Sequence, residues 1–175
     1  MDRVLVVVYS CTGTGRRLAQ LLCAQQQWPM GEVTEIRPRR GASGTWRSVI
    51  DSLFRRRPDV RYDGPAPEQF ETVVLIAPVW LLRLAGPMRS FVASRHASLP
   101  KAAVLMVMGS RGAAQAVAEI ARLTGRGPLL DAGFTNREVE DGSCAGRLQA
   151  LGDALRTIED PVVGVRPAVW SPQAA

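Results

Sequence analysis

The sequence predicts an α/β protein in which helices cover both faces of a doubly wound parallel sheet. Short, uninterrupted apolar runs are typical of strands buried on both sides, and three such runs occur at Val4–Tyr9, Thr72–Ala77 and Ala102–Met108. Segments with apolar residues at helical spacing lie between them. A length of 175 residues suits one domain. We expect this domain over residues 1–160 and a proline-rich tail over 161–175.

The first half of the chain begins with the clearest strand and helix. Leu18, Leu21 and Leu22 fall on one helical face, and the residue before Pro29 is biased away from helical geometry. The next predicted strand alternates polar and apolar residues, which favours a position at the edge of the sheet with one face exposed to solvent. In order, we expect a strand over Val4–Tyr9, a helix to about Gln27, an edge strand over Glu32–Arg37, a helix over Thr45–Phe54 and a surface linker over Arg55–Pro67.

The second half repeats the alternation. Pro78 is expected to close a strand, Pro87 to open a helix at its first position, and Gly125 to end another helix. In order, we expect a strand over Thr72–Ala77, a helix over Gly86–Ala93, a strand over Ala102–Met108, a helix over Ala113–Leu123, a strand over Leu129–Thr135 and a helix over Arg147–Ile158.

Three polar, glycine-containing turns follow predicted strands, at residues 10–15, 78–86 and 109–112. Because the carboxyl ends of parallel strands meet at one edge, these turns are expected to gather there, where open α/β sheets bind ligands. The first turn, Ser10-Cys11-Thr12-Gly13-Thr14-Gly15, combines hydroxyls, glycine backbone amides and a helix N-terminus. That combination predicts a phosphate cradle that needs no lysine.

Three stretches of the sequence resemble the motifs of a known family. V-V-Y-S-C-T-G-T-G-R-R-L-A resembles the N-terminal phosphate loop of flavodoxins. Residues 72–91, TVVLIAPVWLLRLAGPMRSF, are similar to that family's second signature, and LMVMGSRG is similar to its third flavin loop. The resemblance covers roughly residues 3–158.

The resemblance implies a flavodoxin-like three-layer α/β/α sandwich, with a five-stranded parallel sheet in the order 2-1-3-4-5, that binds FMN. Matched residue by residue, Ser10, Thr12, Gly13 and Thr14 would hold the FMN phosphate, within a loop that also contains Cys11 and Gly15. Pro78, Val79, Trp80 and Leu81 would flank the isoalloxazine ring. Gly109, Ser110, Arg111 and Gly112 would contact its polar edge.

The sequence departs from the family pattern at both main loops. Gly15 supplies no hydroxyl where relatives carry Thr or Ser, which removes one phosphate hydrogen bond, about 1–2 kcal/mol. Ala77 stands where relatives often have Thr or Ser, and Leu81-Leu82-Arg83 replaces small residues. A flavin-free flavodoxin-like interaction module is therefore an alternative to a flavoprotein.

Two other motifs compete for the first loop. Gly13-Thr14-Gly15 begins the dinucleotide fingerprint, with Glu35 at the ribose-binding distance, but Leu18 occupies the place of the third glycine. Cys11 and Arg17 are spaced as C-x5-R, which resembles low-molecular-weight tyrosine phosphatases. In such an enzyme Cys11 would be the nucleophile and the Arg17 side chain would bind the phosphate. Asp160 would be a candidate general acid. No G-K-S/T follows the loop, so a P-loop NTPase is excluded.

The net charge of +6 first suggests a nucleic-acid partner. Lys101 is the single lysine, so arginine carries nearly all of the positive charge. We interpret this as a bias of the sequence toward arginine in place of lysine, and not as selection for contacts with phosphates. Arg55–Arg57 lacks interleaved aromatics and is interpreted as a solvated face that can dock an acidic redox partner. Arg83 and Arg111 are the candidates to meet NAD(P)H phosphates.

The remaining composition limits the chemistry. Three cysteines and a single histidine, His96, offer neither a disulfide framework nor a metal site. There is no apolar run long enough for a membrane span and no targeting segment, so we expect a cytoplasmic location. We expect electron transfer, or NAD(P)H-dependent reduction of a small acceptor such as a quinone, without a catalytic side chain. A homodimer is left open.

Overall fold

The computed structural model describes residues 3–36, 58–109 and 111–159. The strands in these ranges are β1 (Val4–Tyr9), β2 (Met30–Glu35), β3 (Val60–Asp63), β4 (Thr72–Trp80), β5 (Arg83–Leu84), β6 (Lys101–Met108) and β7 (Asp131–Thr135). The helices are α1 (Thr14–Gln26), α3 (Gly86–Arg95), α4 (Ala113–Thr124), α5 (Asn136–Asp141) and α6 (Ala145–Glu159), with a 3-10 turn, η1, over Pro67–Gln69.

The strands form one sheet in the order β3-β2-β1-β4-β6-β7, with β5 paired to β4. The parallel pairs join β2, β1, β4, β6 and β7, which confirms the predicted order 2-1-3-4-5. The sheet also contains two antiparallel strands that were not predicted, β3 beside β2 and β5 beside β4. Strand β2 is accordingly paired on both sides and is not the edge strand that its alternating pattern suggested.

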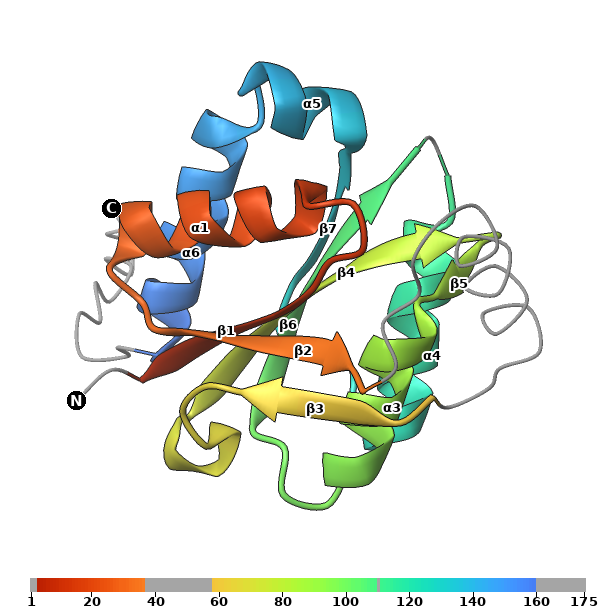
Figure 1. The fold of residues 1–175 in the computed structure, drawn as a ribbon. Helices are drawn as coiled ribbons and strands as arrows, with labels where there is room; N and C mark the ends of the chain where they lie inside the picture. The colour runs from red at the N-terminus through yellow and green to blue at the C-terminus, as the bar shows by residue number, and fades with distance from the viewer. Residues whose placement is uncertain (1–2, 37–57, 110, 160–175) are drawn as a thin grey trace, which may run out of the picture.

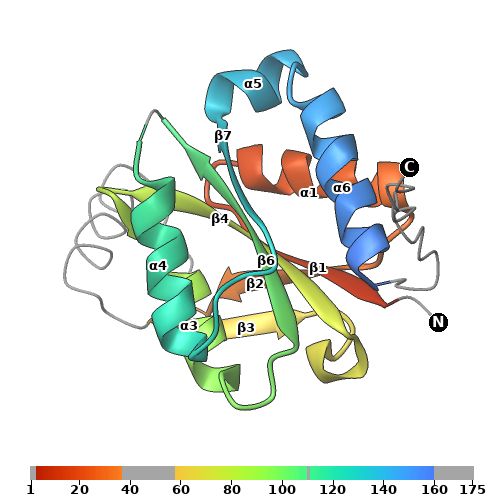
Figure 2. The same cartoon turned by 180° about the vertical axis from the view of Figure 1, so that it is seen from behind.

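Helices cover both faces of the sheet and make three layers (Figure 1, Figure 2). Along β1, Leu5 and Val7 belong to the apolar cluster on the side of α3 and α4, whereas Val6 and Val8 belong to the cluster on the side of α1 and α6. Successive side chains of a strand point to opposite faces. A continuous apolar run is therefore what a strand between two helical layers requires.

Strand β3 lies within the segment that was predicted to be a surface linker. Tyr62 explains the difference: its ring packs on Phe91 with centroids 5.1 Å apart, and its hydroxyl donates to the Pro65 carbonyl at 2.7 Å. A Cβ on Gly31 in β2 would lie 2.1 Å from the Tyr62 hydroxyl. The missing side chain at Gly31 thus makes room for Tyr62 on the neighbouring strand.

Other boundaries differ by short segments. Strand β4 runs through Pro78 to Trp80 instead of closing at the proline, because Pro78 lies beyond the last pair that β4 makes with β1, where fewer backbone donors are needed. Helix α5 was missed, although Thr135 and Glu138 form a capping box at its start. The predicted helix over Thr45–Phe54, Arg55–Arg57 and the tail over 161–175 lie outside the described residues.

Within the described ranges, no helix combines the length and the apolar character needed to cross a lipid bilayer. The same ranges contain no group of three or more His, Cys, Asp or Glu side chains placed to hold a metal ion.

Candidate functional site

The carboxyl ends of β1, β4 and β6 lie along one edge of the sheet, where the three predicted loops follow (Figure 1). The three strands are parallel neighbours, with Val8 opposite Ile76 and Ala77 opposite Met106. The strand order reverses between β1 and β4, because the chain runs outward to β2 after β1 and returns at β4. A ligand site at this edge would occupy the switch point of the sheet.

Helix α1 begins after a left-handed glycine. Gly13 is the N-cap residue with φ +93°, a conformation that glycine adopts without steric cost, and its amide donates to Ser10 Oγ at 3.1 Å. Among the residues that the structure describes, no side chain caps α1, and the first turn of α1 contains no acidic residue. The N–H groups of that turn are therefore suited to an anion, which the helix dipole also favours.

Two threonine hydroxyls lie beside these amides. Thr12 Oγ1 is 3.4 Å from Thr14 Oγ1, with Thr12 exposed and Thr14 half-buried. Gly15 is buried, and a Cβ at this position would lie 3.4 Å from Ser10 Oγ. The loop can thus offer backbone amides and two hydroxyls to a phosphate, while position 15 contributes only backbone.

The second loop is a β-hairpin, which the sequence analysis did not predict. Strand β4 turns back through Leu81 and Leu82 into β5, so that Val79 pairs with Leu84 and Trp80 pairs with Arg83. The Ala85 amide donates to the Pro78 carbonyl at 3.3 Å.

Both residues of the hairpin turn adopt left-handed backbone conformations. Leu81 has φ +47° and Leu82 has φ +62°, where a side chain costs about 1–2 kcal/mol per residue. Two-residue turns of this type usually contain Asn and Gly. The two leucines are also 54% and 49% exposed. The hairpin tip thus combines backbone strain with exposed apolar surface, a combination that points to a functional role.

Trp80 is half-buried and packs against the end of β1. Its ring lies edge-on to the ring of Tyr9, with centroids 6.0 Å apart and an interplanar angle of 85°. The Tyr9 hydroxyl donates to Glu35 Oε1 at 2.7 Å. Tyr9 was assigned only to the buried strand, and its place at the loop edge was missed.

The third loop contacts the second. Gly112, with φ +106°, would bring a Cβ to 2.8 Å from both Leu82 Cα and Val79 Cγ1, so glycine permits this close approach. Gly109 is exposed, and within the described part of the chain no atom lies within 4 Å of a Cβ built on it. Arg111 is exposed as well. Ser110 lies outside the described residues.

The geometry of Cys11 and Arg17 bears on the phosphatase alternative. Both residues are exposed. Helix α1 begins at Thr14, and the Arg17 amide donates to the Gly13 carbonyl at 2.9 Å, so Arg17 stands in the first turns of α1. The group that the phosphatase alternative requires, the Arg17 guanidinium, belongs to an exposed side chain. The candidate general acid Asp160 lies outside the described residues.

The other cysteines are poorly placed for chemistry. Burial raises the pKa of the Cys23 thiol to about 11, and burial also raises the pKa of Cys144. All three cysteines are free.

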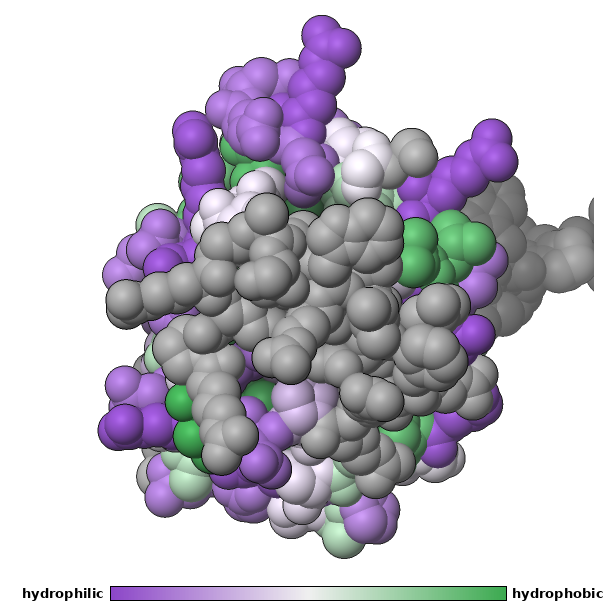
Figure 3. All heavy atoms as spheres, turned by 45° about the vertical axis from the view of Figure 1, so that its right-hand side comes forward, coloured by the Kyte–Doolittle hydropathy of each residue, from purple (hydrophilic) through white to green (hydrophobic). Residues whose placement is uncertain are grey.

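A groove of about 520 Å³ adjoins the hairpin. It is lined by Leu81, Leu82, Arg83, Gln115, Ala118, Glu119 and Arg122. Where Figure 3 colours the surface, hydrophilic residues surround separate hydrophobic patches. The groove thus combines apolar surface at the hairpin with the arginines Arg83 and Arg122.

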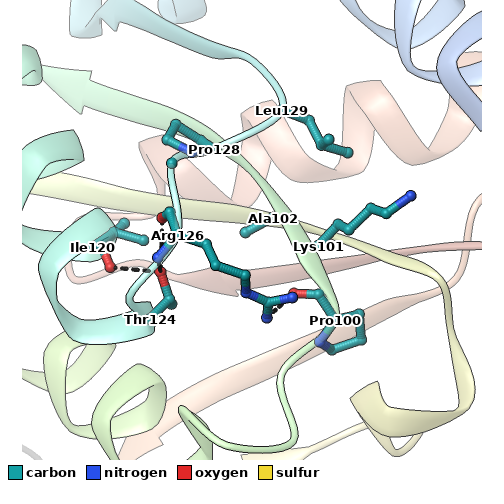
Figure 4. A pocket seen from close by; sticks show the side chains of 9 residues that line it. Pro100, Lys101, Ala102, Ile120, Thr124, Arg126, Pro128 and Leu129 are labelled. Atoms are coloured by element: carbon teal, nitrogen blue, oxygen red, sulfur yellow. Dashed lines mark hydrogen bonds between the residues drawn. The ribbon is translucent and has the colours of Figure 1, made fainter.

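A second cavity, of about 50 Å³, lies at the opposite edge, where β6 begins (Figure 4). Arg126 is one of its lining residues, and its side chain donates to the Leu99 carbonyl at 2.6 Å. This volume is far below the 300–1,000 Å³ typical of small-molecule sites, so it is not a candidate site.

No protein-family model matches the sequence, and no curated protein matches it. Solved structures are similar in fold. A flavoprotein in complex with FMN from Lactobacillus acidophilus NCFM matches with a TM-score of 0.66 and 16% identity, covering 82% of this chain and 99% of its own. A flavodoxin, WrbA-like protein, from Agrobacterium tumefaciens matches with 0.52 and 11%, covering 88% and 99%. An NADH:FMN oxidoreductase in its apo form matches with 0.57 and 12%, covering 90% of each chain.

The chain is an α/β protein whose parallel sheet has a topological switch point between β1 and β4. More particularly, it has the flavodoxin-like fold, as the sequence motifs implied.

Proposed function

We propose that this chain binds FMN at the carboxyl edge of its sheet and works as a redox protein, with residues 1–160 as the flavodoxin-like domain. The observation that carries the proposal is the uncapped start of α1 at Gly13, beside the two hydroxyls of Thr12 and Thr14. This donor set fits a phosphate dianion, since it contains no acidic group and needs no cation. The flavoprotein from Lactobacillus acidophilus NCFM, in complex with FMN, supports the choice of ligand.

The ring of FMN would lie between the second and third loops. Val79, Trp80 and Leu81 would supply apolar and aromatic surface beside it, with Pro78 at the base of the hairpin. Backbone amides at Gly109 and Gly112 would face its polar edge, together with Arg111. When bound, FMN supplies the capacity to accept and donate electrons, and the residues of this chain hold, orient and partly desolvate it.

For the finer role we propose NAD(P)H-dependent reduction of a small acceptor such as a quinone, with electron transfer to a protein partner as the alternative. The groove beside the hairpin supports the first reading, because Arg83 and Arg122 line it next to exposed leucines. The likeness in fold to an NADH:FMN oxidoreductase is a further support. Three free cysteines suit a reducing compartment, and we propose the cytoplasm as the location.

A comparison of FMN with riboflavin, which lacks the phosphate, tests the proposal. The wild-type chain should quench flavin fluorescence on binding and should prefer FMN. In the double variant Thr12→Val/Thr14→Val, two charge-assisted hydrogen bonds are lost at about 1.5–3 kcal/mol each, so the preference for FMN over riboflavin should fall by at least about a hundredfold. Riboflavin binding should be unchanged. Thr157→Val, an exposed threonine on α6, is the matched control and should bind like the wild type.

Two outcomes would contradict the proposal. One is a wild-type chain that binds neither flavin, which would favour a flavin-free interaction module. The other is hydrolysis of p-nitrophenyl phosphate that Cys11→Ser abolishes. The reductase reading is tested by KM for NADH and NADPH, which should rise in Arg83→Ala and in Arg111→Ala. Unchanged KM values in both variants would leave electron transfer to a protein as the better reading.

A further inference from the structure

A buried ion pair joins the two helices that cover one face of the sheet. Arg89 in α3 and Glu119 in α4 are only 2% and 6% exposed, and Arg89 Nε donates to Glu119 Oε1 at 2.5 Å. Helices α3 and α4 lie side by side in both ribbon views (Figure 1, Figure 2). The desolvation of a buried ion pair often exceeds its attraction, and apolar replacements are frequently as stable. Stability alone therefore does not explain why two charges lie here.

The same two side chains also hold the backbone of the hairpin. Arg89 Nη2 donates to the Leu84 carbonyl at 2.8 Å, and the Leu84 amide donates to Glu119 Oε2 at 3.3 Å. Leu84 is the last residue of β5 and is fully buried. The ion pair thus satisfies both backbone groups of the residue at which the hairpin returns to the domain.

The hairpin needs such an anchor. Strand β5 is two residues long and has two register pairs with β4. The turn that precedes it carries the positive φ angles of Leu81 and Leu82, which oppose hairpin closure. A fixed attachment at Leu84 offsets that strain and determines where the hairpin tip lies.

We propose that Arg89 and Glu119 are positioning residues for the flavin site. They hold the hairpin in the conformation that presents Val79, Trp80 and Leu81 at the carboxyl edge of the sheet. The effect on flavin binding rests on the proposed function, whereas the effect on the hairpin does not depend on any ligand.

The double variant Arg89→Met/Glu119→Met tests the proposal, because it removes both charges and leaves neither buried without a partner. We expect amide hydrogen exchange at Leu84 to accelerate at least tenfold. Exchange at Val7 and Leu105, in the central strands, serves as the internal reference and should stay within twofold. FMN affinity should fall about tenfold. The control Arg3→Met/Glu71→Met removes an exposed ion pair of 3.1 Å and should change neither measurement.

Wild-type exchange at Leu84 and wild-type FMN affinity in a folded double variant would overturn the proposal. If that variant does not fold, Arg89→Lys replaces it: lysine keeps the charge beside Glu119 but lacks the guanidinium fork that also reaches Leu84. Unchanged exchange at Leu84 in Arg89→Lys would then overturn the proposal. If the wild-type chain binds no FMN, the proposed function fails, and the exchange measurement alone decides whether the pair positions the hairpin.

Discussion

The indole ring of Trp80 meets the ring of Tyr9 edge-on, with their centroids 6.0 Å apart. These residues end the two strands that flank the switch point, so the pair connects the first and second loops. Replacing Trp80 with Leu should weaken FMN binding about fivefold, since an aromatic contact contributes about 1 kcal/mol beyond its buried area. Flavin fluorescence titration measures the effect. Tyr9→Phe keeps the ring contact and serves as the control; equal affinities of Trp80→Leu and the wild type would contradict the assignment of Trp80.

The contact between the second and third loops depends on Gly112. In Gly112→Ala the new Cβ would lie 2.8 Å from Leu82 Cα and the residue would keep φ +106°. We expect a loss of about 2–4 kcal/mol in the free energy of unfolding, measured by urea denaturation. Gly125→Ala is the matched control, because Gly125 is left-handed too but has open space around it. It should lose only about 1 kcal/mol. Equal losses would indicate that the close approach is unimportant.

The strained turn at Leu81 and Leu82 should make the protein less stable than it could be. The variant Leu81→Asn/Leu82→Gly has the residues that this turn prefers, so it should be about 1 kcal/mol more stable, with Tm higher by about 2–4 °C. Its FMN affinity should fall, because the apolar tip is lost. Leu81→Ala/Leu82→Ala removes the same apolar surface without relieving the backbone and should not raise Tm. A higher Tm in the alanine variant would show that exposure, not strain, limits stability.

Thiol labelling should separate the three cysteines. With a pKa of about 11, the Cys23 thiol is ionised in only roughly one molecule in a thousand at pH 8. Cys144 is buried, and burial raises the pKa of its thiol. Iodoacetamide at pH 8 should therefore label exposed Cys11 alone within minutes, as peptide mass spectrometry would show. Saturating FMN should slow that labelling, since Cys11 lies in the phosphate loop. Rapid labelling of Cys23, or no protection of Cys11 by FMN, would be at odds with this description.

The parts of the fold that the sequence predicted are those with a local signal. The runs at Val4–Tyr9 and Ala102–Met108 are apolar throughout because both faces of each strand are covered, and the structure gives the first the same bounds. The glycine and threonine residues of the first loop likewise follow from what a strand-to-helix turn requires. Local patterns also placed three polar loops at one edge of the sheet.

The parts that were missed depend on contacts between distant segments. Strand β3 is four residues long and is held by Tyr62, which packs on Phe91 and fits over Gly31. Strand β5 is shorter still and is held by a buried ion pair from two helices. Such elements carry no periodicity that a window of sequence can show. Tyr9 was missed at the site for a related reason, because its apolar neighbours made it look like core.

The junction of β2 and β3 has a consequence for the edge of the sheet. The Ile36 amide donates to the Asp59 carbonyl at 3.2 Å, so these two strands stay joined by a backbone hydrogen bond at this end. Because β2 runs parallel to β1, this hydrogen bond lies at the edge that carries the candidate site. It therefore holds the ends of β2 and β3 together at that edge, beyond their last register pair, Glu35 with Val60.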